Sequence, residues 1–296
     1  MELFLKNLFA GVGVGSVYGL IALGIVIIYK SSKIFNFAVG GLVTIGSYMC
    51  WIFMAHLHIY PILAVFGTLI FSIALGFLIE RTTLRPIVGQ PLLASIMMTL
   101  ALSSLFDGLI LFFSEGRFRA YPLFFSKIGI KVGETSLSFS YLASMVALII
   151  LFGVLSAFFK YSRTGLGMRA AAEDHQIARS KGVNIKYVFG LSWAMCSILC
   201  SLGGILLGMI TGAASFYLGI LGLKAFPVVL VAGLESLTGC IIVGPLIGIV
   251  EIFSASYISP YLPWKTFEEV APYLVMLIII LIKPYGFFGL EKIERI

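Results

Sequence analysis

A stretch of 46 residues, Ile34–Ile79, contains no Asp, Glu, Lys or Arg. A helix needs about 20 apolar residues to cross a bilayer core about 30 Å thick, so this stretch is too long for one span and fits two. Two histidines and Pro61 interrupt it and divide it into spans at Asn36–Ala55 and Pro61–Ile79. A chain without charge over such a length is typical of a membrane protein.

The rest of the chain shows the same pattern, and composition agrees, because only 11% of the residues are charged, against about 25% in soluble domains. Residues 212–234 are rich in Gly and contain Lys224 and Pro227, which predicts a broken or tilted segment surrounded by protein or by a water-filled cavity. We therefore predict an all-α integral membrane protein, a polytopic helical bundle of eight to ten transmembrane helices forming one domain over residues 1–296. The nine predicted spans are Asn7–Tyr29, Asn36–Ala55, Pro61–Ile79, Pro91–Phe113, Ser138–Phe159, Tyr187–Ile210, 212–234, Leu237–Ile258 and Val270–Ile282.

The net charge of +7 is distributed in short loops between apolar runs, which favours membrane topology over nucleic-acid binding. If every segment crosses and residues 160–186 are cytoplasmic, 13 Lys and Arg residues lie inside and six lie outside. The positive-inside rule then predicts an N-terminus outside and a C-terminus in the cytoplasm.

Motifs for soluble catalysis are absent from the sequence, which contains no P-loop, HExxH or GxSxG and has three His in total. The four cysteines, Cys50, Cys196, Cys200 and Cys240, lie in apolar runs without a CxxC or Cys/His cluster, which favours packing over metal binding. We therefore expect no catalytic residue, no metal site and no cofactor in this chain. Any ATP must be bound by another subunit.

Two glycine stripes with a spacing of four residues lie on single helix faces, one at Gly11, Gly15 and Gly19, the other at Gly204, Gly208 and Gly212. Glycine at this spacing lets two helix backbones approach closely in a membrane, so helix–helix packing is the favoured interpretation. The alternative is that these faces surround a narrow pathway or contact a second permease subunit.

A few polar groups interrupt the apolar segments. Asn36 opens the second span and either caps that helix or lines a pathway. Glu251 lies inside the eighth span, where a lone carboxylate costs at least about 2.5 kcal/mol, so it either pairs with a cation such as Lys224 or lines a cavity. Asp107 lies near the outer end of the fourth span.

Residues 160–186 are too polar to span a membrane but contain a run of good helix formers, Met168–Lys181, which Gly182 can terminate. Acidic residues in its first half and basic residues in its last turn suit the helix dipole. A helix lying on anionic lipid is one interpretation. Because its apolar face is mostly alanine, a groove on a protein partner fits better.

In order and spacing, these features resemble the transmembrane permease of the branched-chain amino-acid ABC importers, over nearly the whole chain. The matching residues are Gly15, Ser16, Tyr18, Ala22 and Gly24, the run from Asn36 to Gly41, Glu80, Arg81, Arg85 and Pro86, the 169–184 helix, Lys224, Ala225 and Phe226, then Gly233, Ser236, Gly239, Gly244, Gly248 and Glu251, and finally Pro284, Gly286 and Gly289.

The resemblance implies a multi-pass permease of a prokaryotic inner membrane that imports branched-chain amino acids or another small polar solute, such as urea or an amide. It implies ABC ATPase subunits that bind the ATP, a second permease subunit, identical or homologous, and an extracytoplasmic substrate-binding protein as partners. The residues implied in coupling to the ATPases are Arg169, Ala172, Glu173, Asp174, Ala178 and Gly182. For the translocation pathway and its gating we expect Gly15, Tyr18, Asn36, Lys224 and Glu251.

Three positions depart from the family pattern: Val39 and Gly41 stand where the family has His and Glu, and Glu235 stands where it usually has Gly. The substrate is therefore less constrained than the permease role. The rival interpretation is an ion-coupled secondary transporter or channel that uses Glu251 or Asp107, although this leaves the 160–186 helix without a role. A membrane-embedded enzyme would need a polar catalytic cluster, which the sequence lacks.

Overall fold

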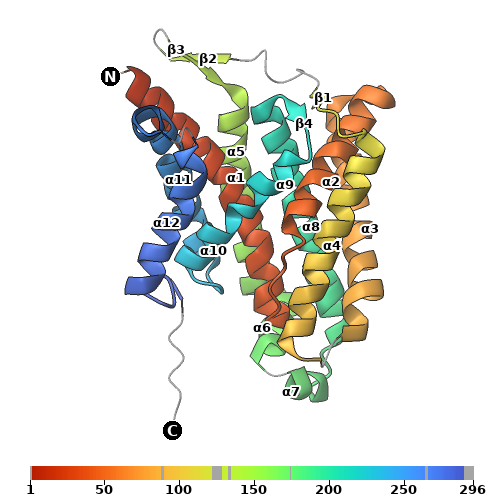
Figure 1. Cartoon of the computed structure of the whole chain (residues 1–296). Helices are drawn as coiled ribbons and strands as arrows, with labels where there is room; N and C mark the ends of the chain where they lie inside the picture. The colour runs from red at the N-terminus through yellow and green to blue at the C-terminus, as the bar shows by residue number, and fades with distance from the viewer. Residues whose placement is uncertain are drawn as a thin grey trace.

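The computed structural model describes residues 2–87, 90–121, 129–132, 135–173, 175–263 and 266–289. They form a bundle of α-helices with a few short strands (Figure 1). The helices are α1 (Glu2–Ser32), α2 (Val39–Trp51), α3 (Pro61–Ile79), α4 (Leu92–Ser114), α5 (Phe139–Tyr161), α6 (Arg163–Glu173), α7 (His175–Ser180), α8 (Ile185–Thr211), α9 (Tyr217–Leu223), α10 (Ala225–Ala232), α11 (Leu237–Phe253) and α12 (Phe267–Ile282).

Short helical and extended segments complete the fold. The strands pair antiparallel at the end of the bundle where α1 begins, β1 (Arg119–Ala120) with β4 (Ala213–Ala214), and β2 (Gly129–Val132) with β3 (Thr135–Ser138) (Figure 1). Their registers align Arg119 with Ala214 and Gly129 with Ser138. The π-helical turns η1 (Ile52–His56), η2 (Glu80–Leu84) and η4 (Ser254–Ile258) extend α2, α3 and α11, and the 3-10 turns are η3 (Arg85–Ile87) and η5 (Ser259–Tyr261).

Seven helical segments in the described ranges are long and apolar enough to cross a membrane, and each corresponds to one predicted span: Glu2–Ser32, Val39–His56, Pro61–Ile87, Leu93–Ser114, Phe139–Tyr161, Ile185–Thr211 and Leu237–Tyr261. The predicted broken segment is α9 followed by α10, interrupted at Lys224. The last predicted span is α12, whose 16 residues rise about 24 Å. The polytopic helical bundle is therefore confirmed.

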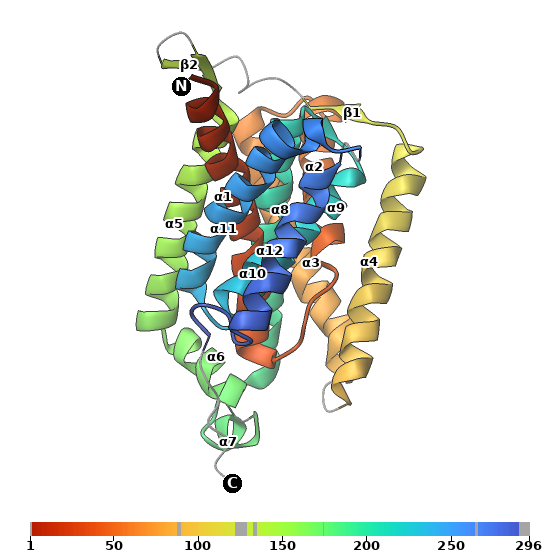
Figure 2. The same ribbon diagram turned by 60° about the vertical axis from the view of Figure 1, so that its left-hand side comes forward.

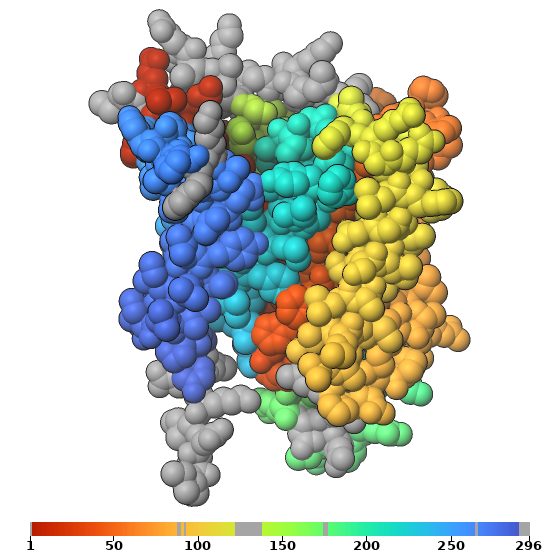
Figure 3. Space-filling model, in the orientation of Figure 1, coloured from red at the N-terminus to blue at the C-terminus, as the bar shows by residue number. Residues whose placement is uncertain are grey.

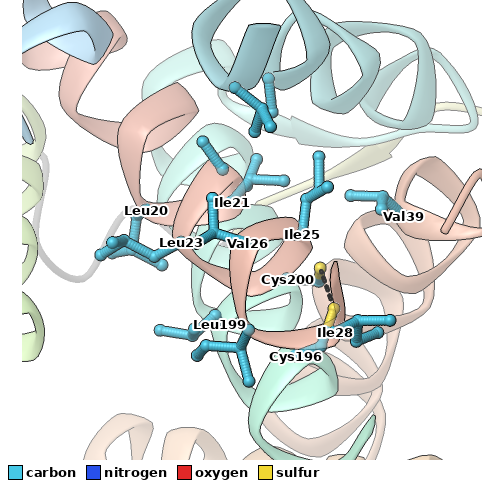
Figure 4. Packing of buried hydrophobic residues seen from close by; sticks show 14 of the residues in the cluster. Leu20, Ile21, Leu23, Ile25, Val26, Ile28, Val39, Cys196, Leu199 and Cys200 are labelled. Atoms are coloured by element: carbon cyan, nitrogen blue, oxygen red, sulfur yellow. Dashed lines mark hydrogen bonds between the residues drawn. The ribbon is translucent and has the colours of Figure 1, made fainter. Parts of the chain in front are cut away.

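Helix α1 forms the centre of the bundle, with α11, α8, α5 and α10 packed around it (Figure 2). Protein surrounds this helix almost completely, because 94% of an apolar stretch of 18 residues within it is buried. Figure 4 shows the resulting core, in which Ile25 and Ile28 of α1 meet Val39 of α2 and Cys196 and Cys200 of α8. By contrast, only 22% of a comparable stretch of 18 residues is buried in α4 and in α5. These two helices therefore leave wide apolar faces for lipid or another subunit.

Except at Gly212, both glycine stripes lie in close packing contacts; Gly212 ends α8 with φ of +76°, and a Cβ there would meet nothing within 4 Å. A Cβ on Gly15 would lie 2.3 Å from the Gly244 carbonyl oxygen of α11, and one on Gly204 would lie 1.9 Å from the Val43 carbonyl oxygen of α2. These distances leave no room for a side chain, so the α1–α11 and α8–α2 pairs require glycine there. Packing within the chain is thus how the structure uses these stripes.

The two ends of the bundle differ in what they carry. The start of α1 and the β2–β3 hairpin lie at one end, whereas α6 and α7 lie at the other, together with the end of α12 (Figures 1 and 2). The turn that follows α12 is fixed there by backbone hydrogen bonds from Phe287 and Phe288 to Val231 and Ala232 at the end of α10.

Candidate functional site

A buried ion cluster occupies the break between α9 and α10. Lys224, only 1% exposed, lies at this break, and its Nζ donates to Oε1 of Glu251 on α11 at 2.7 Å. The same Nζ lies 3.1 Å from Oε2 of Glu269, in the first turn of α12. The break therefore places the lysine between two carboxylates, which supplies the partners that a buried ammonium requires.

Tyrosines surround this ion cluster. Tyr217 of α9 donates from its hydroxyl to Oε1 of Glu269 at 2.5 Å. Tyr18 of α1 is fully buried, and its hydroxyl lies beside the Glu251 carboxylate. The structure thus brings together Tyr18, Lys224 and Glu251, three of the residues predicted for the pathway. Sequence reasoning missed Glu269, although a carboxylate in the first turn of an apolar helix was a visible signal.

The ion cluster faces a recess on one side of the molecule. Figure 3 shows this face, on which the surface is hollowed between α12 (blue) and α4 (yellow), with α9 (teal) and α2 (orange-red) behind. Tyr217 and Ile220 of α9 are 37% and 45% exposed, and the Glu269 side chain is 37% exposed. The charged group nearest to the opening is therefore a carboxylate, while the lysine lies beneath it.

Asn36 is fully buried in the extended segment that leads into α2. Its Oδ1 accepts from the Ala38 backbone N–H at 3.0 Å, and its Nδ2 lies 3.7 Å from the Cys196 sulfur. The side chain thus closes a local turn before α2, whose N-cap is Ala38 without a side-chain hydrogen bond, so the interpretation of Asn36 as the helix cap is wrong. Its role in the pathway stays a prediction, and so does that of Gly15 within the α1–α11 interface.

Aromatic rings adjoin this segment. Phe37 stacks on Phe226 of α10 with ring centroids 5.0 Å apart, and Phe35 stacks on Phe37 at 6.4 Å. Phe226 lies two residues beyond Lys224 in the chain, and side chains at this spacing point to different sides of a helix. No periodic signal in the sequence predicts this stack, since it joins two segments far apart in the chain.

The two family departures at the start of α2 are closely packed. Val39 is fully buried in the core, and a Cβ on Gly41 would lie 2.7 Å from the Phe106 Cβ of α4. A glutamate would not fit at Gly41 without displacing α4. In this chain an apolar contact therefore replaces the two polar groups that the family pattern has there.

The predicted coupling helix is two helices. Helix α6 begins at Arg163, earlier than predicted, because Ser162 Oγ accepts from the Gly165 N–H at 2.8 Å and caps it. Asp174 lies outside the described residues, between α6 and α7. Gly182 follows α7 with φ of +85°, and the Val183 N–H donates to the Ala178 carbonyl, so glycine ends this helix as predicted.

The predicted coupling residues do not share one face. Arg169, Glu173 and Gly182 are exposed, Ala172 is half-buried, and Ala178 is 3% exposed and packs towards the bundle. Leu166 of α6 and Ile177 of α7 are also exposed. Arg169 and Glu173, although exposed, line a hollow between α6 and the bundle, so the two apolar side chains and the two charges do not form one face.

A hollow of about 530 Å³ separates α6 from the ends of α1 and α5. Lys30, Arg169, Glu173 and Glu235 are among the residues that line it. Lys33, which ends α1 with φ of +56°, forms an ion pair with Glu235 at the rim. Glu235, where the family usually has glycine, thus ties the end of α1 to the turn before α11.

Among the described residues, no group of three or more His, Cys, Asp or Glu side chains is arranged to hold a metal ion. The charged clusters in this part of the chain are ion pairs that join neighbouring segments.

Comparison with known proteins agrees with this architecture. Residues 7–282 match the family model described as the branched-chain amino acid transport system / permease component. The branched-chain amino acid permease protein LivH of Salmonella typhimurium is 29% identical, with 99% of this chain and 98% of the relative covered. BraD of Pseudomonas aeruginosa is also 29% identical, over the same shares.

A solved structure, described as PsaBC from Streptococcus pneumoniae in complex with Fab, is similar in fold, with a TM-score of 0.50. The likeness covers 95% of this chain and 92% of that one at 14% identity, so it concerns the fold alone. The match of the family model spans all but the two ends of the chain. The chain therefore belongs to the branched-chain amino acid transport system permease family.

Proposed function

We propose that this chain is the permease subunit of an ATP-driven importer for branched-chain amino acids. The observation that carries the proposal is the family match over residues 7–282, in a fold whose helices α6 and α7 stand outside the membrane bundle. The relatives LivH and BraD are permease proteins of high-affinity branched-chain amino acid transport. This chain contributes the pathway and the coupling, and its partners contribute ATP hydrolysis.

Two cytoplasmic ATPase subunits engage α6 and α7. The exposed Leu166 of α6 and Ile177 of α7 support this, because exposed apolar side chains on helices are common anchors in a groove of a protein partner. Gly165 lets α6 pack closely on the end of α5, where its Cβ would lie 2.6 Å from the Phe158 carbonyl oxygen. A push on α6 is thereby passed to a long membrane helix.

The pathway forms between this chain and a second permease subunit, and a substrate-binding protein delivers the solute. The recess between α12 and α4 supports this arrangement, since the broken helix α9–α10 lies behind it and α12 borders it (Figure 3). Broken helices at membrane depth commonly build such sites.

The α6–α7 end is cytoplasmic and the start of α1 is outside, in a prokaryotic inner membrane. Two observations support this orientation: the excess of Lys and Arg predicted for that side, and the lysines Lys30 and Lys33, which lie with Arg169 around the same hollow.

The test is reconstitution of the chain with its ATPases, a second permease and the binding protein in proteoliposomes. We expect ATP-dependent uptake of leucine, isoleucine and valine. The control is the same complex assembled with an ATPase whose Walker site is inactivated. Uptake of urea or an amide instead of these amino acids would show that the substrate is another small polar solute. Transport by the permease without ATPases would instead favour the ion-coupled transporter or channel.

A further inference from the structure

The ion cluster of Lys224, Glu251 and Glu269 has one more negative charge than positive charge. Lys224 Nζ contacts one oxygen of each carboxylate, at 2.7 Å and 3.1 Å. The other oxygen of Glu251, Oε2, is buried and has no partner in hydrogen-bonding geometry among the described residues. The single lysine is therefore fully engaged, while acceptor capacity remains on the acidic side.

Glu269 is the carboxylate nearest to the recess, whereas Glu251 Oε2 is buried. Exposure of the side chains rises from 1% at Lys224 through 11% at Glu251 to 37% at Glu269. Tyr217 donates to Glu269 and is itself 37% exposed, as is Tyr273 one turn further along α12. A group that approaches from the recess thus meets carboxylate oxygens and phenol rings before it meets the lysine.

This arrangement selects a cationic donor. A carboxylate or other anion is repelled by the surplus charge, and a neutral amide donates hydrogen bonds roughly half as strong as those of a cation to a carboxylate. An ammonium group gains from both features, because aromatic ring faces also attract cations.

We propose that Glu269, with the rings of Tyr217 and Tyr273, binds the primary ammonium group of the transported solute. The inference rests on the proposed function and deepens it, since it assigns amino acids rather than urea or neutral amides to the pathway of this chain. Glu269 is the first contact and Lys224 holds the two carboxylates in place.

A reporter cysteine at Ile220 tests the electrostatics without any transport. Ile220 is 45% exposed and lies one helical turn from both Tyr217 and Lys224, and the four native cysteines are buried, so the parent chain is the blank. In the assembled complex, I220C is labelled with a trimethylammonium-bearing and with a sulfonate-bearing methanethiosulfonate. We expect the ratio of the cationic to the anionic rate to fall about fivefold in I220C/E269Q, as one nearby, partly screened charge would cause.

The matched control is I220C/E268Q, which removes the neighbouring carboxylate that accepts a hydrogen bond from Ser259. Its rate ratio should equal that of I220C. An unchanged ratio in I220C/E269Q, or an equal fall in the control, would overturn the proposal.

Protection from labelling tests the ligand class. Leucine and leucinol at millimolar concentration should slow the labelling of I220C, whereas 4-methylpentanamide, which has the same carbon chain and no ammonium group, should not. I220C/E269Q should lose the protection. Equal protection by the amide would overturn the inference while leaving leucine import intact. Ammonium-dependent protection in a complex that imports no branched-chain amino acid would instead overturn the proposed function.

Discussion

Lys224 Nζ lies 2.7 Å from Glu251 Oε1 and joins the break between α9 and α10 to α11. Glu269 of α12 approaches the same lysine from the other side, at 3.1 Å. The break between α9 and α10, helix α11 and helix α12 are thereby fixed to one buried cation, although Lys224 and Glu269 are 45 positions apart in the sequence. Because water cannot solvate these charges inside the bundle, they stabilise each other only while all three segments keep their places.

Removing the lysine should destabilise the protein more than removing one of its partners. K224M leaves the buried Glu251 carboxylate without a cation, for which we expect a loss of about 3–5 kcal/mol. E251Q leaves Lys224 paired with Glu269, so its loss should be smaller. Thermal unfolding of the purified complex, followed by tryptophan fluorescence, ranks the two variants.

The double variant K224M/E251Q is the control for this ranking. It should recover part of the loss of K224M, since it removes the unpaired carboxylate. A double variant no more stable than K224M would contradict the ion-pair explanation.

The α1–α11 interface should not accept a methyl group. G15A places a Cβ 2.3 Å from the Gly244 carbonyl oxygen, so the two backbones must separate, at a cost of about 1–3 kcal/mol. G153A in α5, where a Cβ meets nothing within 4 Å, is the matched control and should be neutral or slightly stabilising. Size-exclusion chromatography after heating measures both. Equal melting of the two variants would be inconsistent with the interface described.

Substitutions in α6 and α7 should distinguish effects on docking to the ATPase from effects on folding. E173K changes an exposed charge and should alter stability by no more than about 0.5 kcal/mol, yet lower substrate-stimulated ATP hydrolysis if α6 docks on the ATPase. A178L adds volume at a buried position and should instead reduce stability by about 1–3 kcal/mol. Unchanged coupled ATPase activity in E173K would argue against docking through this face.

The stability of the protein should depend on the ion pair between Arg85 and the buried Glu80 carboxylate. Arg85 Nη2 and Nε donate to the two Glu80 oxygens at 2.8 and 3.2 Å, and the Glu80 side chain is 3% exposed. R85A therefore leaves a buried charge unpaired, with an expected loss of about 1.5–3 kcal/mol. R117A removes the partner of the exposed Glu115 and should cost about 0–1 kcal/mol. Thermal unfolding compares them, and similar melting temperatures would contradict this view.

Much of the fold follows from the sequence, because the bilayer requires the backbone to satisfy its own hydrogen bonds over about 20 residues at a time. The break at 212–234 was also predictable. Pro227 removes a backbone hydrogen bond of a continuous helix, and a lysine at membrane depth needs a charged or polar partner. The start of α6 was misplaced by five residues, because the Ser162 cap acts through a local hydrogen bond that hydrophobic periodicity does not report.

The candidate site was predictable in part. Lys224 and Glu251 stand out in an apolar sequence, since a charge at membrane depth is costly unless it pairs or has a functional role. Glu269 was visible only as a carboxylate at the start of an apolar helix, and its contact with Lys224, like the Phe37–Phe226 stack, joins residues distant in the chain.

The sequence by itself determined that this chain is a helical membrane protein with charge concentrated at α6–α7, since those properties depend on composition and local spacing. Only the tertiary structure decided which polar groups meet. The lysine acquires two carboxylates, the glycine stripe of α1 faces α11, and Ala178 turns inward because packing selects the neighbours of each helix face. Side-chain contacts between helices depend on rotation and depth in three dimensions, and no one-dimensional spacing fixes these.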